Sequence, residues 1–364
     1  MKKLLIVDDS AFMRKLITEF FSENAYIEVV GTARNGRDAL EKVRILNPDV
    51  LTMDVEMPEM TGVEAVKQLM IENPKPVVML SSTTTADAAI TMEAIANGAV
   101  DFIAKPSGTI SLDLDKIKDD LIEKVIAASN IPIEKLRRKE RISKIPIKKP
   151  IFEKPIIVEK RIQEKTNQVW HKNHKKIILI GTSTGGPRAL QEVLTRLPKD
   201  IKAPILIVQH MPPGFTKSLA KRLDQLSDIT VKEAEQGDLL QPGTAYIAPG
   251  GYQMTARKVG MTYSIHIDEH APVVGGHKPA VDVLFDSVAT LTDIDRIAVI
   301  MTGMGADGSK GIKMLKRSGN TRVISEDERT CVVYGMPKSA EKTGLVDRVA
   351  PLDEIPQAIL NYLY

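Results

Sequence analysis

The stretch KKIILIGTSTGGP, Lys175 to Pro187, decides how the larger half of this chain folds. Its apolar run is followed by glycines, hydroxyl residues and a proline, and then by the helical pattern RALQEVLTRL. This order is typical of a strand that turns directly into a helix, the unit from which α/β domains are built. The turn fits two functions: a glycine-rich loop that binds a phosphate on helix N–H groups, or a G-x-S-x-G turn that presents Ser183 as a nucleophile.

Residues 176–364 repeat this alternation of strands and helices. The clearest further strands lie in the segments APILIVQH, GTAYIAPG, RIAVIMTG and TRVISED. The pattern predicts a doubly wound, largely parallel, Rossmann-like sheet. In such a sheet the residues that follow the strands face one crevice, where ligands bind.

Three chemically useful side chains follow strands of this predicted sheet. Ser183 follows the first strand, His210 closes the second, and Asp307 lies in the loop TGMGADGS after the strand RIAVIM. An imidazole can remove the serine proton and return it to a leaving alcohol, while a carboxylate orients the imidazole and stabilises its cation. Backbone N–H groups of the glycine-rich loops, with Met304 the first candidate, would bind the oxyanion. The sequence therefore predicts an acyl-transfer triad.

Each of these residues also has a purely structural interpretation. Ser183 is placed to cap the helix that follows it, and Asp307 to cap the helix that begins near GSKGIKMLK. His210 fits a core or loop histidine. The coincidence of all three on strand-end loops of one sheet favours the triad, whereas the remaining histidines, including His277, have no comparable placement in the sequence.

The loop TGMGADG also matches a dinucleotide-binding fingerprint. Its glycines spell G-x-G-x-x-G between a strand and a helix, and acidic residues end the next strand about 20 residues later. A pyrophosphate bound there would share the helix N-terminus with the Asp307 carboxylate, which is electrostatically unfavourable. A dinucleotide site also leaves Ser183 and His210 without a role. A DNA-binding function for residues 177–364 is disfavoured as well, since this segment is much longer than a single helix-turn-helix module.

Residues 1–128 contain five strand–helix units with polar side chains at the strand ends. The strands lie in KLLIVDD, YIEVVGTA, PDVLTMD, KPVVMLSS and GAVDFIAKP, which predicts a parallel sheet. Their polar ends are Asp8, Asp9, Asp54, Ser81 and Lys105. Three neighbouring carboxylates repel one another unless a cation lies among them, and oxygen ligands with open positions suit Mg²⁺. Asp54 is then placed to attack a phosphoryl donor, with Ser81 and Lys105 binding the phosphoryl oxygens.

Length and charge divide the chain into two domains and a linker. Its 364 residues are enough for two domains of roughly 150 residues. Residues 134–176 hold 15 Lys and Arg against 5 Asp and Glu, lack glycine and include three prolines. This composition predicts a basic, semi-stiff linker at residues 129–175, and its few aromatic residues disfavour nucleic-acid binding.

The apolar runs of the sequence are short. None approaches the roughly 20 residues that span a bilayer, and the N-terminal MKKLLIVDDS runs into acidic residues where a signal peptide would stay apolar. A cytoplasmic location is therefore expected. Cys331 is the single cysteine and lies in the apolar stretch TCVVYGM, so a buried, unreactive thiol is expected.

Residues 1 to about 125 resemble a flavodoxin-like response-regulator receiver domain. The matching pieces are VDDS, TMDVEMPEMTGVE around Asp54, the serine pair at 81–82 and FIAKP. The resemblance implies that a histidine kinase phosphorylates Asp54 and that Ser81 and Phe102 act as switch residues. Phe102 keeps the ring of the tyrosine found in many receivers but lacks its hydroxyl. The Mg²⁺ ligands that the resemblance implies are Asp8, Asp9, Asp54 and the backbone carbonyl of Glu56.

Nearly the whole chain resembles the chemotaxis protein-glutamate methylesterases, the CheB family. The motifs that carry this resemblance are GTSTGGP, IVQHMPPGFT, AYIAPGG, GHKPAVDVLF, TGMGADGSKG and CVVYGMPKSA. The site residues that it implies are the triad Ser183, His210 and Asp307, the neighbouring hydroxyl of Thr184 and the oxyanion donor Met304. It implies no cofactor for the esterase site. Two departures from the family pattern, Gln253 in place of a histidine and Glu326 in place of a glutamine, are expected at the rim of the crevice.

The same resemblance implies a function, partners and domain limits. The expected reaction is hydrolysis of γ-glutamyl methyl esters on the cytoplasmic helices of chemoreceptors, with release of methanol, and deamidation of receptor glutamines. The expected partners are a chemotaxis histidine kinase and methyl-accepting chemoreceptors. The receiver is expected at 1–128 and the methylesterase domain at 176–364. The unphosphorylated receiver is expected to pack over the catalytic crevice, and phosphorylation of Asp54 to shift the population toward an open arrangement.

Overall fold

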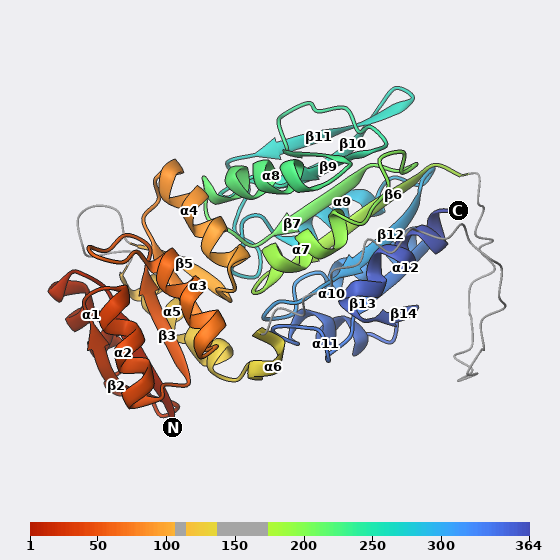
Figure 1. The fold of residues 1–364 in the computed structure, drawn as a ribbon. Helices are drawn as coiled ribbons and strands as arrows, with labels where there is room; N and C mark the ends of the chain where they lie inside the picture. The colour runs from red at the N-terminus through yellow and green to blue at the C-terminus, as the bar shows by residue number, and fades with distance from the viewer. Residues whose placement is uncertain (106–113, 137–173) are drawn as a thin grey trace.

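The computed structural model describes residues 1–105, 114–136 and 174–364, which form two α/β domains in contact (Figure 1). The first is a parallel five-stranded sheet in the order β2-β1-β3-β4-β5, which confirms the predicted flavodoxin-like class. Its strands are β1 (Lys2–Val7), β2 (Ile27–Ala33), β3 (Val50–Asp54), β4 (Val77–Ser81) and β5 (Asp101–Ala104). Its helices are α1 (Ala11–Phe21), α2 (Gly36–Leu46), α3 (Gly62–Glu72), α4 (Thr85–Ala96), α5 (Leu114–Ser129) and α6 (Ile133–Leu136).

Local sequence explains where these elements begin and end. Strands β3 and β4 are buried along their whole length, as strands covered by helices on both faces must be, and they are largely apolar up to a polar last residue. Helices α1 to α4 each begin at a side-chain cap that accepts a backbone N–H three residues later: Ser10, Asn35, Thr61 and Thr84. The strand-end side chains therefore stay in the loops at one edge of the sheet.

The second domain is a seven-stranded sheet in the order β14-β13-β12-β6-β7-β9-β8, parallel throughout. Its strands are β6 (Lys176–Thr182), β7 (Ile205–Gln209), β8 (Thr230–Glu233), β9 (Thr244–Ile247), β12 (Asp295–Ile300), β13 (Thr321–Glu326) and β14 (Arg348–Ala350). Its helices are α7 (Gly186–Leu194), α8 (Phe215–Leu226), α9 (Val281–Ala289), α10 (Ser309–Ser318), α11 (Met336–Glu341), the 3₁₀ helix η1 (Leu352–Glu354) and α12 (Ile355–Leu363).

An antiparallel hairpin that the sequence pattern did not predict lies beside this sheet. It consists of β10 (Gln253–Val259) and β11 (Thr262–Asp268), and α9 packs against β10. Met254, Ala256 and Ile265 are buried, while the turn between the strands is exposed. The hairpin covers one side of the domain and leads directly into the loop before α9.

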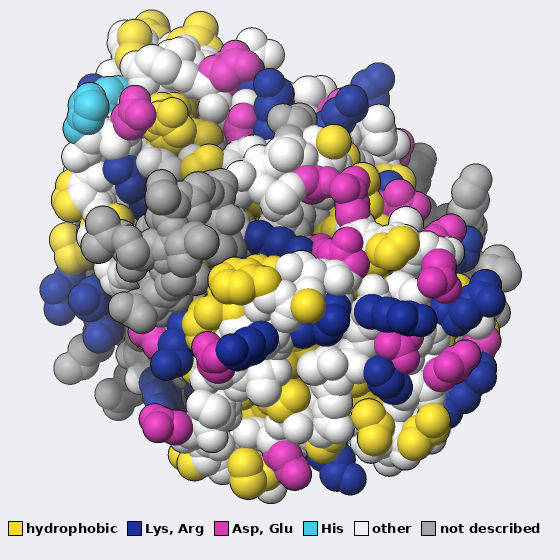
Figure 2. All heavy atoms as spheres, turned by 90° about the vertical axis from the view of Figure 1, so that its left-hand side faces the viewer, with side chains coloured by type: hydrophobic (Ala, Val, Ile, Leu, Met, Phe, Trp, Pro, Cys, Tyr) yellow, Lys and Arg dark blue, Asp and Glu magenta, His cyan; other side chains and the backbone are white. Residues whose placement is uncertain are grey.

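The two domains meet at a packed interface. Helix α4 packs against α8 and α7 (Figure 1). The ring of Phe102, in β5, stacks on that of Phe215 at the start of α8, with centroids 4.4 Å apart and planes 27° apart. Both rings are buried, and one continuous apolar cluster contains residues of both domains. On the face of the first domain that points away from this interface, basic, acidic and apolar side chains are mixed (Figure 2).

The predicted linker is described only at its ends. Residues 137–173 lie outside the described residues. Residues 129–136 complete α5 and form α6, and Leu136 joins the apolar core of the first domain. At the far end, His174 lies 3.6 Å from the carboxylate of Asp295.

Two further expectations concern membrane spans and the cysteine. Among the described residues, no helix is both long enough and apolar enough to cross a membrane. Cys331 is 1% exposed, which confirms that its thiol is buried.

Candidate active site

Strand register brings Ser183 and His210 side by side. Strands β6 and β7 are parallel neighbours in which Thr182 pairs with Gln209, so Ser183 and His210 each stand one residue beyond that pair. The N–H of His210 donates to the carbonyl of Thr182 at 3.2 Å, and the Gln209 side-chain amide donates to the carbonyl of Ser183 at 2.9 Å. The two loops therefore leave the sheet together.

Asp307 reaches His210 from the loop after β12. Its Oδ2 lies 2.8 Å from Nε2 of His210, and both side chains are at least nine-tenths buried. The same carboxylate accepts the backbone N–H of Val281 at 2.7 Å and of Asp282 at 2.8 Å, which are the first residues of α9. Burial raises the pKa of Asp307, but the hydrogen bonds from His210 and from these N–H groups outweigh it, so the pKa lies below its usual value.

The second ring nitrogen of His210, Nδ1, does not bond to Asp307. Among the described residues, Nδ1 of His210 is buried and makes no hydrogen bond. A buried ring nitrogen without a partner is costly, so such an atom usually marks a site for a reacting group or a water. Ser183, whose side chain is part-exposed beside it in the strand register, is the nearest candidate by placement.

The structural interpretations of Ser183 and Asp307 do not hold. Helix α7 begins at Gly186 with Gly185 as its N-cap and no side-chain cap, so Ser183 is not a helix cap. Asp307 does cap a helix, but it is α9 and not the helix that follows it in sequence. At the start of α10, the helix of the fingerprint, the N–H of Gly308 donates to Asp307 and that of Gly311 donates to Asp282, so these groups are not free to hold a pyrophosphate.

Thr302 ties the loops around Ser183 together. Its carbonyl accepts the N–H of Ser183 at 3.0 Å and the hydroxyl of Thr182 at 2.8 Å. Its own hydroxyl donates to the carbonyl of Thr184 at 2.9 Å, and its N–H donates to the carboxylate of Glu326 at 2.8 Å. The backbone around Ser183 is thus fixed by the sheet on one side and by the β12 loop on the other.

The predicted oxyanion region lies against Ser183. A Cβ atom added to Gly303 would stand 2.7 Å from the Cβ of Ser183, so only glycine allows the two loops to come so close. Met304 follows immediately and is partly exposed. Thr184 is 2% exposed, and its hydroxyl makes no hydrogen bond among the described residues.

The expectation that Gln253 and Glu326 lie on the rim of the crevice is wrong. Gln253 is 1% exposed and Glu326 is fully buried. The Glu326 carboxylate accepts the backbone N–H of Thr302. The Gln253 side chain donates to the carbonyl of His277 at 3.3 Å and accepts the N–H of Ala280 at 2.9 Å. Both residues position loops of the site and do not line its opening.

His277, whose place in the sequence does not predict a role, lies in this site against His210. Its ring stacks on that of His210, with centroids 3.6 Å apart and planes 10° apart. It lies in the irregular loop between β11 and α9. The signal available in the sequence was its place in the motif GHKPAVDVLF, because no strand or helix periodicity predicts that this loop folds back to His210.

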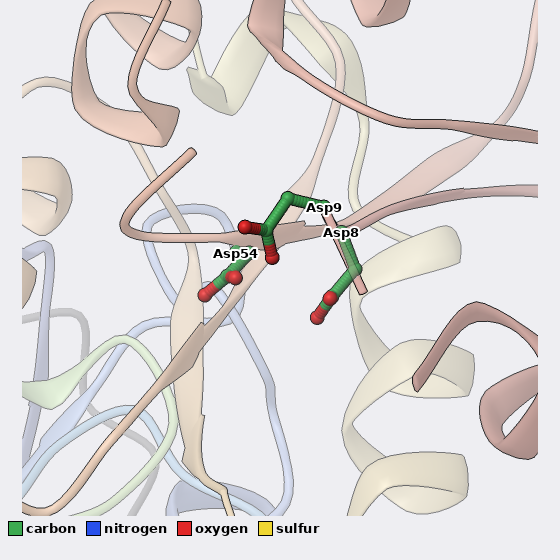
Figure 3. Close-up of side chains that lie close together, drawn as sticks. All are labelled: Asp8, Asp9 and Asp54. Atoms are coloured by element: carbon green, nitrogen blue, oxygen red, sulfur yellow. The ribbon is translucent and has the colours of Figure 1, made fainter. Parts of the chain in front are cut away.

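A second cluster lies at the strand ends of the first domain. Carboxylate oxygens of Asp8, Asp9 and Asp54 lie within 4.8 Å of one another, and Figure 3 shows the three side chains together. The Lys105 ammonium lies 3.0 Å from Asp8 and 2.7 Å from Asp54. Burial raises the pKa of Asp54 to about 6, although Lys105 acts against this shift. Three carboxylates at this spacing fit a divalent cation with oxygen ligands.

The remaining predicted receiver residues surround this cluster. Ser81 is fully buried, and its hydroxyl accepts the hydroxyl of Thr91 at 2.7 Å. Glu56 lies two residues beyond Asp54 in the loop after β3, with its side chain exposed. Phe102, the predicted aromatic switch, is 3% exposed and is the residue that stacks on Phe215 of the second domain.

Comparison with known proteins identifies both domains. The CheB methylesterase family matches residues 178–359, and the response regulator receiver domain family matches residues 4–114. A protein-glutamate methylesterase/protein-glutamine glutaminase of Geobacillus kaustophilus is 53% identical over 361 residues, which cover 99% of this chain and 98% of the relative. A protein of the same name from Bacillus subtilis is 47% identical over 361 residues, with 99% and 98% covered.

A solved structure is also similar to the second domain. The catalytic domain of the Thermotoga maritima CheB methylesterase is 46% identical, covers 51% of this chain and 98% of its own, and has a TM-score of 0.49. The sequence relatives extend over both domains of this chain. On this evidence the chain belongs to the CheB methylesterase family, with a response-regulator receiver domain ahead of the methylesterase domain.

Proposed function

We propose that this protein is a phosphorylation-regulated serine esterase that hydrolyses glutamate γ-methyl esters on chemoreceptors and deamidates receptor glutamines. The observation that carries the proposal is the hydrogen bond between Asp307 and Nε2 of His210, because it leaves the buried Nδ1 of His210 without a partner among the described residues while Ser183 follows the neighbouring strand. This arrangement has the three roles that acyl transfer requires. The names of the relatives, which cover both domains, agree with it.

The proposed reaction proceeds through an acyl-enzyme. Nδ1 of His210 takes the Ser183 proton while the serine oxygen attacks the ester carbonyl carbon. The tetrahedral oxyanion is bound by backbone N–H groups, of which that of Met304 is the first candidate. The intermediate collapses, and the methoxy group leaves with the proton from His210 as methanol. A water then attacks the acyl-enzyme with the same histidine as base. The bond to the Ser183 oxygen breaks, His210 returns the proton to that oxygen, and the glutamate carboxylate is released. With a glutamine side chain, the leaving group is ammonia.

The receiver is the proposed regulatory switch. Asp8, Asp9, Asp54 and the carbonyl of Glu56 would hold Mg²⁺. When bound, the ion supplies charge neutralisation for transfer of a phosphoryl group to Asp54. Lys105 is placed to bind the phosphoryl oxygens, and a chemotaxis histidine kinase is the proposed donor. Chemoreceptors as substrates and a cytoplasmic location complete the proposal.

Packing between the domains supports regulation by access. Phe215 follows the loop that leaves His210, and its ring stacks on that of Phe102 in the receiver. On the other side, Val332 packs against the apolar core of the receiver and lies directly over Gly185 of the nucleophile loop. The receiver therefore packs beside the His210 loop through Phe215 and beside the Ser183 loop through Val332, and its release would open the site to a receptor helix.

Phosphorylation is expected to raise esterase activity about tenfold, a usual size for coupling between two sites. The measurement is methanol release from methylated receptor membranes with Mg²⁺, in the presence and absence of a small-molecule phosphodonor such as acetyl phosphate. Asp54→Ala should keep the basal rate and lose the response. Asp49→Ala, another acidic residue of the same domain, is the matched control and should respond like the wild type. Equal stimulation of the Asp54 variant would rule out this coupling.

Removing the receiver is expected to have a similar effect. Residues 170–364 alone contain the complete seven-stranded sheet and should release methanol roughly tenfold faster than the unphosphorylated full chain, because no domain covers the Ser183 loop. The phosphodonor should not change the rate of this fragment. A fragment no faster than the unphosphorylated full chain would indicate that the receiver does not restrict the site and that the linker holds the two domains apart.

A further inference from the structure

His277 is held against His210 by its backbone, independently of its ring. The N–H groups of Val274 and His277 each donate to the carbonyl of the other residue, at 3.1 and 3.0 Å. The buried Gln253 side chain donates to the carbonyls of Pro272 and His277 and accepts the N–H of Ala280. These contacts fix both ends of the loop between β11 and α9. The imidazole is therefore presented to the site by a supported loop, and none of the hydrogen bonds that hold the loop among the described residues involves the ring itself.

The geometry of the ring pair suits one protonation state of His210. Two neutral aromatic rings favour an offset or edge-to-face arrangement over a face-to-face stack. Here the centroids are 3.6 Å apart and the planes nearly parallel, so the rings lie face to face. The face of a neutral aromatic ring attracts a cation placed over it. The stack is thus more favourable when His210 carries the proton that it takes from Ser183 than before it does so.

We propose that His277 is a positioning residue that stabilises the protonated ring of His210 in the transition state and holds it in the plane defined by Asp307. The inference rests on the proposed esterase function. An interaction that is stronger in the transition state than in the ground state raises kcat more than it changes KM. His277 does not touch the ester and transfers no proton.

Burial and the nearby charges keep the His277 ring neutral for this role. Burial and the neighbouring charges of His210 and Lys124 lower the pKa of His277, while Asp307 raises it, and the result is about 4. Lys124 belongs to α5 of the receiver and hydrogen-bonds the carbonyl of Phe102 at 2.9 Å. At neutral pH the single cation of the ring pair is therefore His210 after it has accepted the proton.

Three substitutions of His277 separate the aromatic face from simple filling of space. In the full chain, with phosphodonor present throughout, His277→Ala and His277→Leu should each lower kcat for methanol release about tenfold, the effect of one desolvated cation–ring contact. KM should change less than about twofold, since ground-state binding is untouched. His277→Phe restores an uncharged aromatic face and should stay within about threefold of the wild type. His270→Ala, an exposed histidine of the same loop, is the matched control.

A second measurement reports on Ser183 without a receptor. The rate at which a fluorophosphonate labels Ser183 should fall in the Ala and Leu variants and be retained in the Phe variant. The inference is overturned if Leu is as active as Phe, because packing alone then suffices, or if Ala keeps the wild-type kcat. Wild-type protein that releases no methanol would refute the proposed function itself, a result distinct from any difference among the His277 variants.

Discussion

Ser183→Ala is expected to abolish methanol release, with kcat lowered roughly a millionfold, as when the nucleophile of a serine hydrolase is removed. The alanine has no oxygen to attack the ester, and His210 has no proton to accept. The residual rate should come only from the oxyanion donors and from substrate binding. The measurement is methanol release from methylated receptor membranes, with a gas-phase assay sensitive enough to detect a small fraction of the wild-type rate.

The fold should survive this substitution because the structural bonds of Ser183 are made by its backbone. Its N–H donates to Thr302, and its carbonyl accepts from Gln209 and from the N–H of Gly186 at 2.8 Å. A Tm within about 2 °C of the wild type is therefore expected, as for a substitution that removes no buried contact. Ser218→Ala, in α8, is the control and should keep full activity. Methanol release that persists in the Ser183 variant would place the nucleophile elsewhere.

The fold was predictable because its signals are local. Apolar runs that end in a polar residue mark the buried parallel strands, and the polar residues Asp8, Asp54 and Ser81 do stand at strand ends of the first sheet. The same logic predicted that Ser183 and His210 leave neighbouring strands, since parallel strands share one carboxyl edge. The β10–β11 hairpin was not predicted, although β11 alternates polar and apolar residues along its length. The alternation of β10 breaks at the adjacent Arg257 and Lys258, and its last three residues are exposed.

The supporting residues of the site were not predictable because their positions depend on loops. His277 meets His210 only through a loop fixed by Gln253, and nothing in the residue pattern sets that contact. Glu326 ends a strand as predicted, but its carboxylate turns inward to the N–H of Thr302. Sequence patterns tell which residues end strands. They do not tell which of those side chains face the crevice and which face the core.

His210→Gln is expected to be nearly as damaging as loss of the serine, with kcat lowered by about five to six orders of magnitude. Glutamine is chosen because its side-chain amide can still donate to the buried Asp307 carboxylate, which would otherwise lose its partner and destabilise the fold. The amide has no basic nitrogen near neutral pH, so Ser183 keeps its proton. His266→Gln, on β11 and outside the site, is the control. Methanol release and the rate of fluorophosphonate labelling should fall together.

The double variant Ser183→Ala/His210→Gln tests whether the two residues act as one unit. If Nδ1 of His210 serves only to take the Ser183 proton, removing it from an enzyme that already lacks the hydroxyl costs nothing further, and the double variant should match Ser183→Ala within about threefold. Independent contributions would instead multiply, and the double variant would be slower than either single variant by several orders of magnitude. That second outcome would mean that His210 acts on the substrate directly and not only as the base for Ser183. The buried Nδ1 atom would then need a partner other than Ser183.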